Sequence, residues 1–327
     1  MTEIDFVVTW VDDSDPVWLK DYKKHRKTGS LDSSSVRFRN WDNFHYWFRG
    51  VEKFAPWVRK VHLITSGHIP KWLNLENPKL NIVRHADYID QKYLPTFSSI
   101  VIENNIPFIK GIAEHFVLFN DDFFLTSHTK AERFFSEGLP CDMAVQNALS
   151  GDGNAQVIMN IVELLNQDFP KGNILRNNVD KWFNLKYRKY LLKNFFLMPW
   201  PRFTGFVEPH LPQPYIKSLM KLTYEKYQDE FIKTNCFRFR DKSNINHYIY
   251  RYVQLLSGKF KPFFVYDKAW FYSIDDTNYI DVCKSISSGK YQIIVINDSK
   301  LTNFEQVRAE VNSSLDNILP NKSSFEN

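Results

Sequence analysis

The sequence predicts an α/β fold with a Rossmann-like, mostly parallel sheet, flanked by helices and carrying a helical insertion or subdomain. Short apolar segments rich in β-branched and aromatic residues alternate with segments of helical periodicity, which is the pattern of βαβ units. Several apolar segments also run directly into polar clusters. In parallel sheets such clusters meet at one edge, where ligands bind, so this edge is where we expect the functional site.

The elements follow in chain order from composition and spacing. Strands are expected over residues 4–11, 58–65, 80–84, 116–119, 235–241 and 291–296, from their β-branched and aromatic content. Pro16 favours the first turn of a helix that continues through residues 18–27. Further helices are expected over residues 43–54, 98–105, 160–166, 180–197, 215–231 and 245–256.

The length and composition allow one large domain or two modest ones, and we expect one large domain. Of the 327 residues, 43% are hydrophobic, which is enough for a substantial core. We assign residues 1–300 to this domain and expect a helical insertion over about 155–200. Residues 301–327 are polar, and we expect them to form a C-terminal tail with a frayed end.

The charge and cysteine content restrict the partners and the compartment. The net charge of +5 is scattered, which suits anionic ligands or an anionic membrane surface and does not suit nucleic acid. The three cysteines, Cys141, Cys236 and Cys283, are widely spaced and form no disulfide or metal-binding pattern. No signal peptide and no apolar run of membrane-spanning length is expected. These features predict a cytoplasmic protein, with peripheral contact at the inner face of the plasma membrane left open.

The segment 180–197 is both basic and aromatic, and it allows two interpretations. Lysine and arginine alternate there with Trp, Phe and Leu residues. The simpler interpretation is an amphipathic helix that packs on the core. The alternative is an interfacial helix that rests on anionic lipid.

The stretch 116–125 contains the clearest chemical motif. Four apolar residues run into Asn120, Asp121 and Asp122, and the chain then becomes apolar again. Two adjacent carboxylates cannot be buried unpaired, so they need a metal ion, a cationic partner or a cleft that holds water. Mg²⁺ and Mn²⁺ prefer such carboxylate oxygens. The alternative is an Asp pair that caps a turn or helix.

A resemblance to a known family rests on four separated blocks. The first is residues 4–16, Ile-Asp-Phe-Val-Val-Thr-Trp-Val-Asp followed by Asp-Pro. The second extends from Arg37-Phe38-Arg39 through Leu94-Pro95-Thr96-Phe97-Ser98-Ser99 to Phe119-Asn120-Asp121-Asp122. The third is Glu208-Pro209-His210-Leu211-Pro212 with Phe239-Arg240 later, and the fourth is Val295-Ile296-Asn297-Asp298. In these blocks the chain resembles the Stealth family of sugar-phosphate transferases. Asp13 and Val8 depart from the family pattern, in which Gly and Tyr are usual.

The resemblance implies an activity. It implies transfer of a hexose-1-phosphate unit from a UDP-sugar to a glycan hydroxyl, with release of UMP, in capsular or cell-wall polysaccharide synthesis. A divalent metal, Mg²⁺ or Mn²⁺, is expected. The acceptor is a glycan or a lipid-linked oligosaccharide. The default donor is UDP-GlcNAc, and UDP-ManNAc, UDP-GalNAc and UDP-Gal remain open, as does the oligomeric state.

The family motifs place the catalytic role on four residues. Asn120 and Asp121 belong to the catalytic centre by analogy. His210 lies in a proline-rich segment, and its imidazole suits the removal of a proton from the acceptor hydroxyl. Asp121 is the rival base. Arg240 can grip the transferring phosphate with its planar guanidinium, and the alternative is a surface ion pair.

Further residues are assigned to the donor and the metal. Trp10 and Asp12 follow the first strand and are expected to contact the donor nucleotide, although Trp10 also fits a core role. Arg37 and Arg39 are candidates for the diphosphate. Asp298 joins Asp121 and Asp122 as a candidate metal ligand, and a contact of Asn297 and Asp298 with phosphate is the alternative.

Two other functions stay in contention. A metal-dependent glycosyltransferase would move the sugar alone and release UDP, with Asp121 and Asp122 as its acidic metal motif. A non-catalytic glycan-binding subunit would need neither of these carboxylates. For His68, His85 and Asp87, at the ends of the second and third strands, a capping or core role is as good an interpretation as a functional one.

Overall fold

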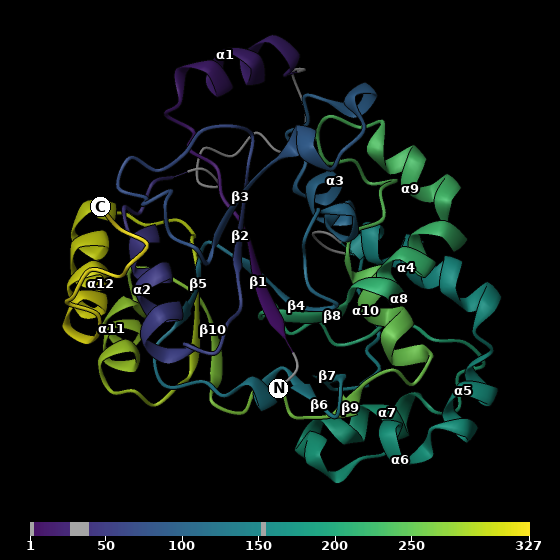
Figure 1. Cartoon of the computed structure of the whole chain (residues 1–327). Helices are drawn as coiled ribbons and strands as arrows, with labels where there is room; N and C mark the ends of the chain where they lie inside the picture. Colours follow the sequence, from purple (N-terminus) through teal and green to yellow (C-terminus); the bar gives the residue numbers. More distant parts are fainter. Residues whose placement is uncertain (1–2, 27–38, 152–154) are drawn as a thin grey trace.

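The computed structural model describes residues 3–26, 39–151 and 155–327 (Figure 1). Its central sheet has five strands in the order β3-β2-β1-β4-β8. Strands β1 to β4 pair in parallel, and β8 pairs antiparallel with β4 at one edge. Helices flank this sheet, so the predicted fold class is confirmed. The strands are β1 (Ile4–Thr9), β2 (Val61–Thr65), β3 (Leu80–Arg84), β4 (His115–Asn120) and β8 (Gln213–Ile216).

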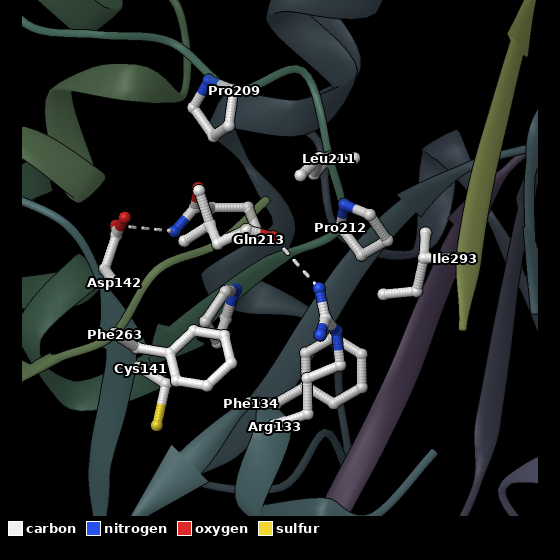
Figure 2. Close-up of a pocket in the computed structure, with 12 residues that line it drawn as sticks. Arg133, Phe134, Cys141, Asp142, Pro209, Leu211, Pro212, Gln213, Phe263 and Ile293 are labelled. Atoms are coloured by element: carbon white, nitrogen blue, oxygen red, sulfur yellow. Dashed lines mark hydrogen bonds between the residues drawn. The ribbon is translucent and has the colours of Figure 1, made fainter. Parts of the chain in front are cut away.

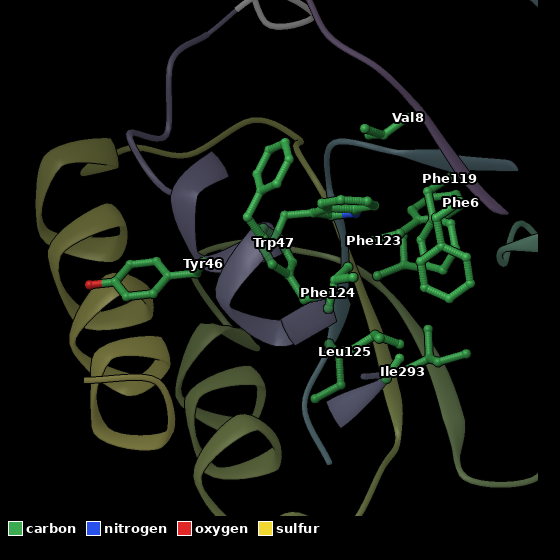
Figure 3. Packing of buried hydrophobic residues seen from close by; sticks show 14 of the residues in the cluster. Phe6, Val8, Tyr46, Trp47, Phe119, Phe123, Phe124, Leu125 and Ile293 are labelled. Carbon is green, nitrogen blue, oxygen red and sulfur yellow. The ribbon is translucent and has the colours of Figure 1, made fainter. Parts of the chain in front are cut away.

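The central strands are covered on both faces, because their side chains alternate between two hydrophobic clusters. In β1, Phe6 and Val8 join one cluster and Val7 joins the other. Phe119 of β4 lies beside Phe6 in the first cluster, with ring centroids 4.6 Å apart (Figure 3). Strands covered in this way need nearly continuous apolar runs, which explains why β1 and β4 could be recognised in the sequence.

A second sheet and three helices complete the first cluster (Figure 3). The sheet has the order β10-β11-β5, with β10 and β11 parallel and β5 antiparallel to β11. Gly50 lets the first of these helices lie against β5, because a Cβ atom there would be 2.8 Å from the carbonyl oxygen of Leu125. The elements are α2 (Phe44–Phe54), β5 (Phe123–Leu125), β10 (Ala269–Ser273), α11 (Tyr279–Ser287), β11 (Ile293–Asn297) and α12 (Phe304–Ile318).

Helices on the other face of the central sheet form the second cluster. They are α3 (Ser99–Asn104), α4 (Ala155–Asp168), α8 (Lys217–Lys226), α9 (Gln228–Asn235) and α10 (Tyr248–Leu256). A third, small sheet has the order β6-β7-β9. The remaining elements are α1 (Pro16–His25), β6 (Phe135–Ser136), β7 (Leu139–Asp142), α5 (Lys171–Asn177), α6 (Val179–Trp182), α7 (Leu191–Leu197) and β9 (Lys261–Pro262), with 3-10 helices at η2 (His85–Asp87), η3 (Gln91–Tyr93), η4 (Ile106–Phe108), η5 (Ala131–Arg133) and η6 (Leu185–Tyr190).

Three predicted elements are wrong. The helix over 180–197 is divided into α6, η6 and α7, because Asn184 is extended at ψ 128° after α6 and Arg188 adopts φ 54°, outside the helical region, within η6. The helix over 215–231 begins as strand β8, and Tyr227 at φ −111° then separates α8 from α9. The strand over 235–241 does not form. Residues 236–241 form a turn and loop instead, in which Phe239 stacks on Phe97 with ring centroids 5.3 Å apart.

The C-terminal residues do not fray. Val307, Val311 and Leu315 recur every four residues along α12 and are buried in the first cluster. Phe325 is also buried there, and the side chain of Arg49 in α2 holds that of Glu326 in an ion pair at 2.8 Å. The expectation of a frayed end is therefore wrong, because three apolar residues at helical spacing outweigh a polar composition. The division into a domain over 1–300, an insertion over about 155–200 and a tail stays a prediction.

Within the described ranges, no helix is long and apolar enough to cross a membrane.

Candidate active site

The carboxyl ends of the parallel strands bring the predicted polar clusters to one edge of the central sheet. Thr9 of β1 pairs with Asn120 of β4, so the residues that follow these strands are neighbours. Because β8 runs antiparallel to β4, with Leu118 opposite Gln213, the segment before β8 reaches the same edge. That segment contains His210. The topology therefore gathers side chains from distant parts of the chain.

Asp121 and Asp122 form the turn between β4 and β5, and both keep partial contact with solvent. The backbone N–H of Ile296 donates to the carbonyl oxygen of Asp122 at 3.0 Å, which brings the end of β11 to this turn. Burial raises the pKa of Asp121 to about 6, although backbone N–H groups of the same turn oppose the rise. Burial and the charges of Asp121 and Asp298 raise the pKa of Asp122 well above its usual range. The turn is therefore a place where a proton or a cation is stabilised.

Arg39 engages both carboxylate oxygens of Asp298. Its Nε donates to Oδ2 at 3.0 Å and its Nη2 donates to Oδ1 at 2.8 Å. The same Nη2 donates to the carbonyl oxygen of Ser299, and the guanidinium lies 4.3 Å from the ring centroid of Phe304. Burial raises the pKa of Asp298, and the hydrogen bonds from Arg39 oppose that rise. Arg39 therefore anchors the end of β11.

The residues fit a divalent cation only in part. No group of three or more His, Cys, Asp or Glu side chains within the described ranges is arranged to hold a metal ion. Asp121 and Asp122 offer carboxylate oxygens of the kind that Mg²⁺ and Mn²⁺ prefer. Each oxygen of Asp298 accepts a hydrogen bond from Arg39 and keeps a lone pair, so its assignment as a metal ligand also stays a prediction. The metal assignment of Asp121 and Asp122 stays a prediction.

His210 is held by aromatic rings at the edge of the sheet. Its ring makes edge-to-face contacts with Phe123, at a centroid distance of 5.4 Å, and with Phe271, at 5.1 Å. Its φ of 46° is uncommon for a residue other than glycine, and such backbone conformations are enriched at functional sites. The residue remains exposed at its outer side, while burial of the ring and the charge of Arg240 lower its pKa. His210 is thus a neutral imidazole at pH 7, able to accept a proton.

Arg240 lies in the loop after α9, where its Nη2 donates to Ser99 Oγ at 2.5 Å. Its charge acts on two groups that sequence reasoning missed, the buried Glu103 and the half-buried His247, with Oε2 and Nε2 3.6 Å apart. Burial raises the pKa of Glu103 to about 7, although the charge of Arg240 opposes the rise. Burial, with the nearby charges of His210, Arg251 and Arg240, lowers the pKa of His247 to about 3. The one sequence clue was an acidic residue inside the apolar helix α3.

The segment that carries His210 is supported by Asp142, which Figure 2 shows beside Gln213 and which forms a buried ion pair with Arg251. Gln213 Nε2 donates to Asp142 Oδ2 at 3.2 Å, and Arg251 Nε donates to the same oxygen at 2.7 Å. Arg251 and Asp142 are buried almost completely. A cavity of about 20 Å³ lies between this segment and Arg133, which is room for about one water molecule. The cavity is too small for a sugar, so we interpret it as part of the packing beneath the segment of His210 and not as a substrate pocket.

Trp10 and Asp12 lie at the end of β1, beside the turn of Asp121. The Trp10 ring stacks on Phe44 with centroids 5.6 Å apart. The backbone N–H of Asp12 donates to His68 Nε2 at 2.9 Å, and burial lowers the pKa of His68, which is therefore neutral at pH 7. Asp12 Oδ1 accepts hydrogen bonds from Ser14, so its carboxylate also caps a turn. Contact of Trp10 and Asp12 with a nucleotide stays a prediction.

Three more residues were singled out in the sequence, and the structure, over the residues that it describes, gives none of them a position in the candidate active site. Burial lowers the pKa of His85 to about 4, which keeps this side chain neutral. Asp87 Oδ2 accepts from the backbone N–H of Arg84 at 2.7 Å, a capping role. Arg37 lies outside the described residues.

Comparison with known sequences identifies two conserved regions. The family model described as Stealth protein CR1, conserved region 1, matches residues 2–29. The model described as Stealth protein CR2, conserved region 2, matches residues 37–141. These matches cover β1 and the whole stretch from Arg37 to the turn of Asp121 and Asp122.

Curated relatives match over nearly the full length of the chain. The chain is 42% identical to the capsular polysaccharide phosphotransferase WcwK of Streptococcus pneumoniae, with 100% of this chain and 98% of that protein covered. It is 41% identical to the receptor polysaccharide phosphotransferase WefC of Streptococcus oralis, with 100% of both covered. It is 39% identical to the exopolysaccharide phosphotransferase cps2G of Lactiplantibacillus plantarum, with 99% of this chain and 96% of that protein covered.

Proposed function

The chain belongs to the Stealth family of polysaccharide phosphotransferases, and from this premise we propose that it transfers a hexose-1-phosphate unit from a UDP-sugar to a hydroxyl group of a glycan. The observation that supports the proposal is that the ring of His210 lies against Phe123, the residue after the turn of Asp121 and Asp122, at one edge of the central sheet. A base near two carboxylates suits displacement at phosphorus, where an acceptor must lose a proton and charge must be stabilised.

The bonds change in one displacement. The acceptor oxygen forms a bond to the phosphorus that carries the sugar, and the bond from this phosphorus to the bridging oxygen of UMP breaks. UMP leaves with the bonding electron pair, and a phosphodiester links the sugar to the acceptor. The hydroxyl proton passes to His210, whose lowered pKa keeps it neutral, or to Asp121, whose raised pKa suits a base near neutral pH.

Other residues position the charged groups. Arg240 lies near enough to His210 for its charge to lower the pKa of that histidine, and its guanidinium binds the transferring phosphate. Asn120, at the end of β4, orients the reacting groups beside Asp121. Mg²⁺ or Mn²⁺, when bound, neutralises charge on the diphosphate, and Asp121 and Asp122 would hold it. Trp10 and Asp12, at the end of the neighbouring strand, contact the nucleotide.

The setting of the reaction is proposed from the family. The donor is a UDP-sugar, by default UDP-GlcNAc, and the acceptor is a glycan or a lipid-linked oligosaccharide. The relatives are named for capsular, receptor and exopolysaccharide phosphotransfer, so the product belongs to a surface polysaccharide. Sugar nucleotides are cytoplasmic metabolites, so we place the enzyme in the cytoplasm.

The nucleotide product tests the proposal. The protein is incubated with Mg²⁺ or Mn²⁺, a panel of UDP-sugars and a glycan acceptor, and UMP is separated from UDP. Acceptor-dependent UMP is expected, because the sugar leaves with its phosphate. Acceptor-dependent UDP would show that the sugar moves alone and that the protein is a glycosyltransferase. Binding of glycan without either product across the panel would favour a non-catalytic subunit.

A further inference from the structure

The segment around α7 exposes an unusual number of large apolar side chains. Seven of the sixteen large hydrophobic residues that are exposed in the described parts of the chain fall within residues 179–200. Leu185 is 85% exposed and Phe196 is 73% exposed. Isolated apolar residues on a surface need no explanation, but a cluster of this kind marks an interaction site.

Helix α7 is oriented with its apolar face outward. Leu192, Phe195 and Phe196 have the spacing of one helix face, and all three are exposed. The buried residues of α7 are Leu191 and Asn194. A soluble amphipathic helix normally turns its apolar face to the core, so the arrangement of α7 is the reverse of the usual one.

A buried amide fixes this orientation. Asn194 Nδ2 donates to the carbonyl oxygens of Ala144, at 2.7 Å, and of Trp182, at 2.6 Å. Asn194 Oδ1 accepts from the backbone N–H of Gln146 at 2.7 Å. Rotating α7 to bury Phe196 would break all three hydrogen bonds and leave buried polar groups unpaired. The outward apolar face is therefore built into the fold.

The same part of the chain carries its main concentration of positive charge, so the expectation that the basic excess is scattered is wrong. Residues 169–205 contain eight Lys or Arg residues and one acidic residue, Asp180, which gives a net charge of +7. The whole chain carries +5, so the remainder is −2. Lys186, Lys189 and Lys193 are exposed between the apolar side chains. Apolar and cationic groups are thus presented together.

The composition of this surface selects the partner. Interfaces between proteins are depleted in lysine, and here the exposed cations among the apolar groups are mainly lysines. A second copy of the chain would set one strongly positive surface against another. A bilayer with anionic headgroups can bind both the apolar and the cationic side chains of this surface. The aromatic and aliphatic groups enter the membrane interface, and the lysines contact the headgroups.

We propose that α7 and its flanking segments dock on an anionic phospholipid bilayer. This α7 surface consists of the lysines Lys186, Lys189 and Lys193 and the apolar residues Leu185, Leu192, Phe195, Phe196, Met198 and Trp200. Figure 1 shows α6 and α7 at the end of the molecule opposite α1, which follows the carboxyl end of β1. Docking through the α7 surface therefore leaves the candidate active site open to the aqueous side.

Vesicle sedimentation tests the proposal on the whole protein. The vesicles contain phosphatidylcholine alone or phosphatidylcholine with phosphatidylglycerol. The wild type is expected to sediment with the anionic vesicles, and to be released by high salt because exposed charges are screened. Two double variants are expected to bind the anionic vesicles at least about tenfold more weakly than the wild type. They are Leu192→Ser with Phe196→Ser, and Lys186→Glu with Lys189→Glu.

Matched control variants make the same kinds of substitution at exposed positions outside the α7 surface, and so test whether the effect is specific to that surface. Leu222 and Ile280 are 61% and 49% exposed on α8 and α11, so Leu222→Ser with Ile280→Ser removes similar apolar area elsewhere. Lys284→Glu with Lys290→Glu makes the same charge change at exposed positions near α11. Both controls are expected to bind like the wild type, and all variants to keep the wild-type melting temperature and the wild-type rate on a soluble acceptor.

Three results would overturn the proposal. The first is absence of wild-type binding, or equal binding to neutral and anionic vesicles. The second is unchanged binding by the Leu192 and Phe196 variant. The third comes from size-exclusion chromatography: if the wild type is a dimer that this variant converts to a monomer, the surface faces a second copy of the chain. None of these results depends on which nucleotide the enzyme releases.

Discussion

Arg39 and Asp298 are 259 residues apart in the chain, yet the guanidinium of one holds both carboxylate oxygens of the other, at 3.0 and 2.8 Å. The pair ties the segment before α2 to the end of β11, next to the turn of Asp122. The charge of Asp298 contributes to the raised pKa of Asp122. Asp298 therefore acts on the site through its charge and its position, while its oxygens are already engaged.

This pairing leads to a prediction about metal dependence. Asp122→Asn should raise the Mg²⁺ or Mn²⁺ concentration needed for half-maximal UMP release by at least about tenfold, because a charged ligand is lost. Asp298→Asn should change it by less than about threefold, because pairing with the Arg39 guanidinium weakens the attraction of this carboxylate for the ion. The measurement is a metal titration after removal of metal with EDTA. An equal effect of both substitutions would restore Asp298 as a ligand.

The raised pKa of Asp121 predicts how stability depends on pH. Burial moves this pKa from 3.8 to about 6, so the folded protein holds the proton at a pH where the unfolded chain has lost it. The stability that the group contributes is present below about pH 4 and is lost as the pH rises through about 6. Asp121→Asn removes the buried charge and should stabilise the protein above pH 6, by on the order of 1 kcal/mol after allowance for partial exposure.

The same substitution should abolish transfer while it raises the melting temperature at pH 7. At pH 4 the variant and the wild type should melt at the same temperature, because the wild-type carboxyl is then neutral. Thermal unfolding followed by circular dichroism over pH 4–8 measures the difference. A melting temperature at pH 7 that Asp121→Asn lowers would show that the carboxylate is a structural cap of its turn.

His210 is expected to matter for the rate far more than for the fold. His210→Gln should lower kcat for acceptor-dependent UMP release by about 10²–10⁴-fold, the usual contribution of a general base. Its ring packs on Phe123 and Phe271 but its outer side is exposed, so the melting temperature should fall only slightly. His128 is exposed as well and lies in the loop after β5, so His128→Gln serves as the control. A kcat within about threefold of wild type would assign the base to Asp121 instead.

The sequence was most informative where local pattern and tertiary environment agree. Strands β1 and β4 are apolar because both faces are covered, and the polar residues after them could be placed at one edge by topology alone. The approach of His210 also depends on β8 running antiparallel to β4, a pairing that no local pattern records. Only the family motif pointed to that histidine.

The failures have equally specific causes. Arg188 interrupts the predicted helix over 180–197 with one backbone conformation that arginine seldom adopts. The outward face of α7 depends on three hydrogen bonds of the buried Asn194, all to distant backbone groups. Glu103 and His247 meet only in the folded chain. Contacts between residues far apart in the chain cannot be predicted from the periodicity or the composition of the sequence.

The C-terminal helix is expected to be part of the folding unit. Leu315 is fully buried in the cluster that α12 shares with α2, so Leu315→Ala should lower the free energy of unfolding by about 2–5 kcal/mol. Ser313 is exposed on the same helix, and Ser313→Ala should leave stability unchanged or raise it slightly. Urea unfolding followed by tryptophan fluorescence gives both values. An unchanged midpoint for Leu315→Ala would restore the independent tail.

The buried ion pair of Asp142 and Arg251 should be the most sensitive polar contact in the structure. Arg251 donates to both oxygens of Asp142, at 2.7 and 2.8 Å, and also to the carbonyl oxygen of Val207, at 2.8 Å. Asp142→Ala leaves a fully buried guanidinium without its carboxylate partner and should lower the free energy of unfolding by about 3–5 kcal/mol. The double variant Asp142→Leu with Arg251→Met removes both charges and should recover much of that loss.

The two variants also separate stability from positioning of His210. Gln213, at the start of β8, loses its contact with Asp142 in both variants, and Arg251 supports Val207, three residues before His210. The double variant should therefore fold well and still show a reduced kcat, because the segment of His210 is less firmly held. Urea unfolding and UMP release, measured on the same preparations, test this. If the double variant regains stability and full kcat together, the ion pair supports the fold alone.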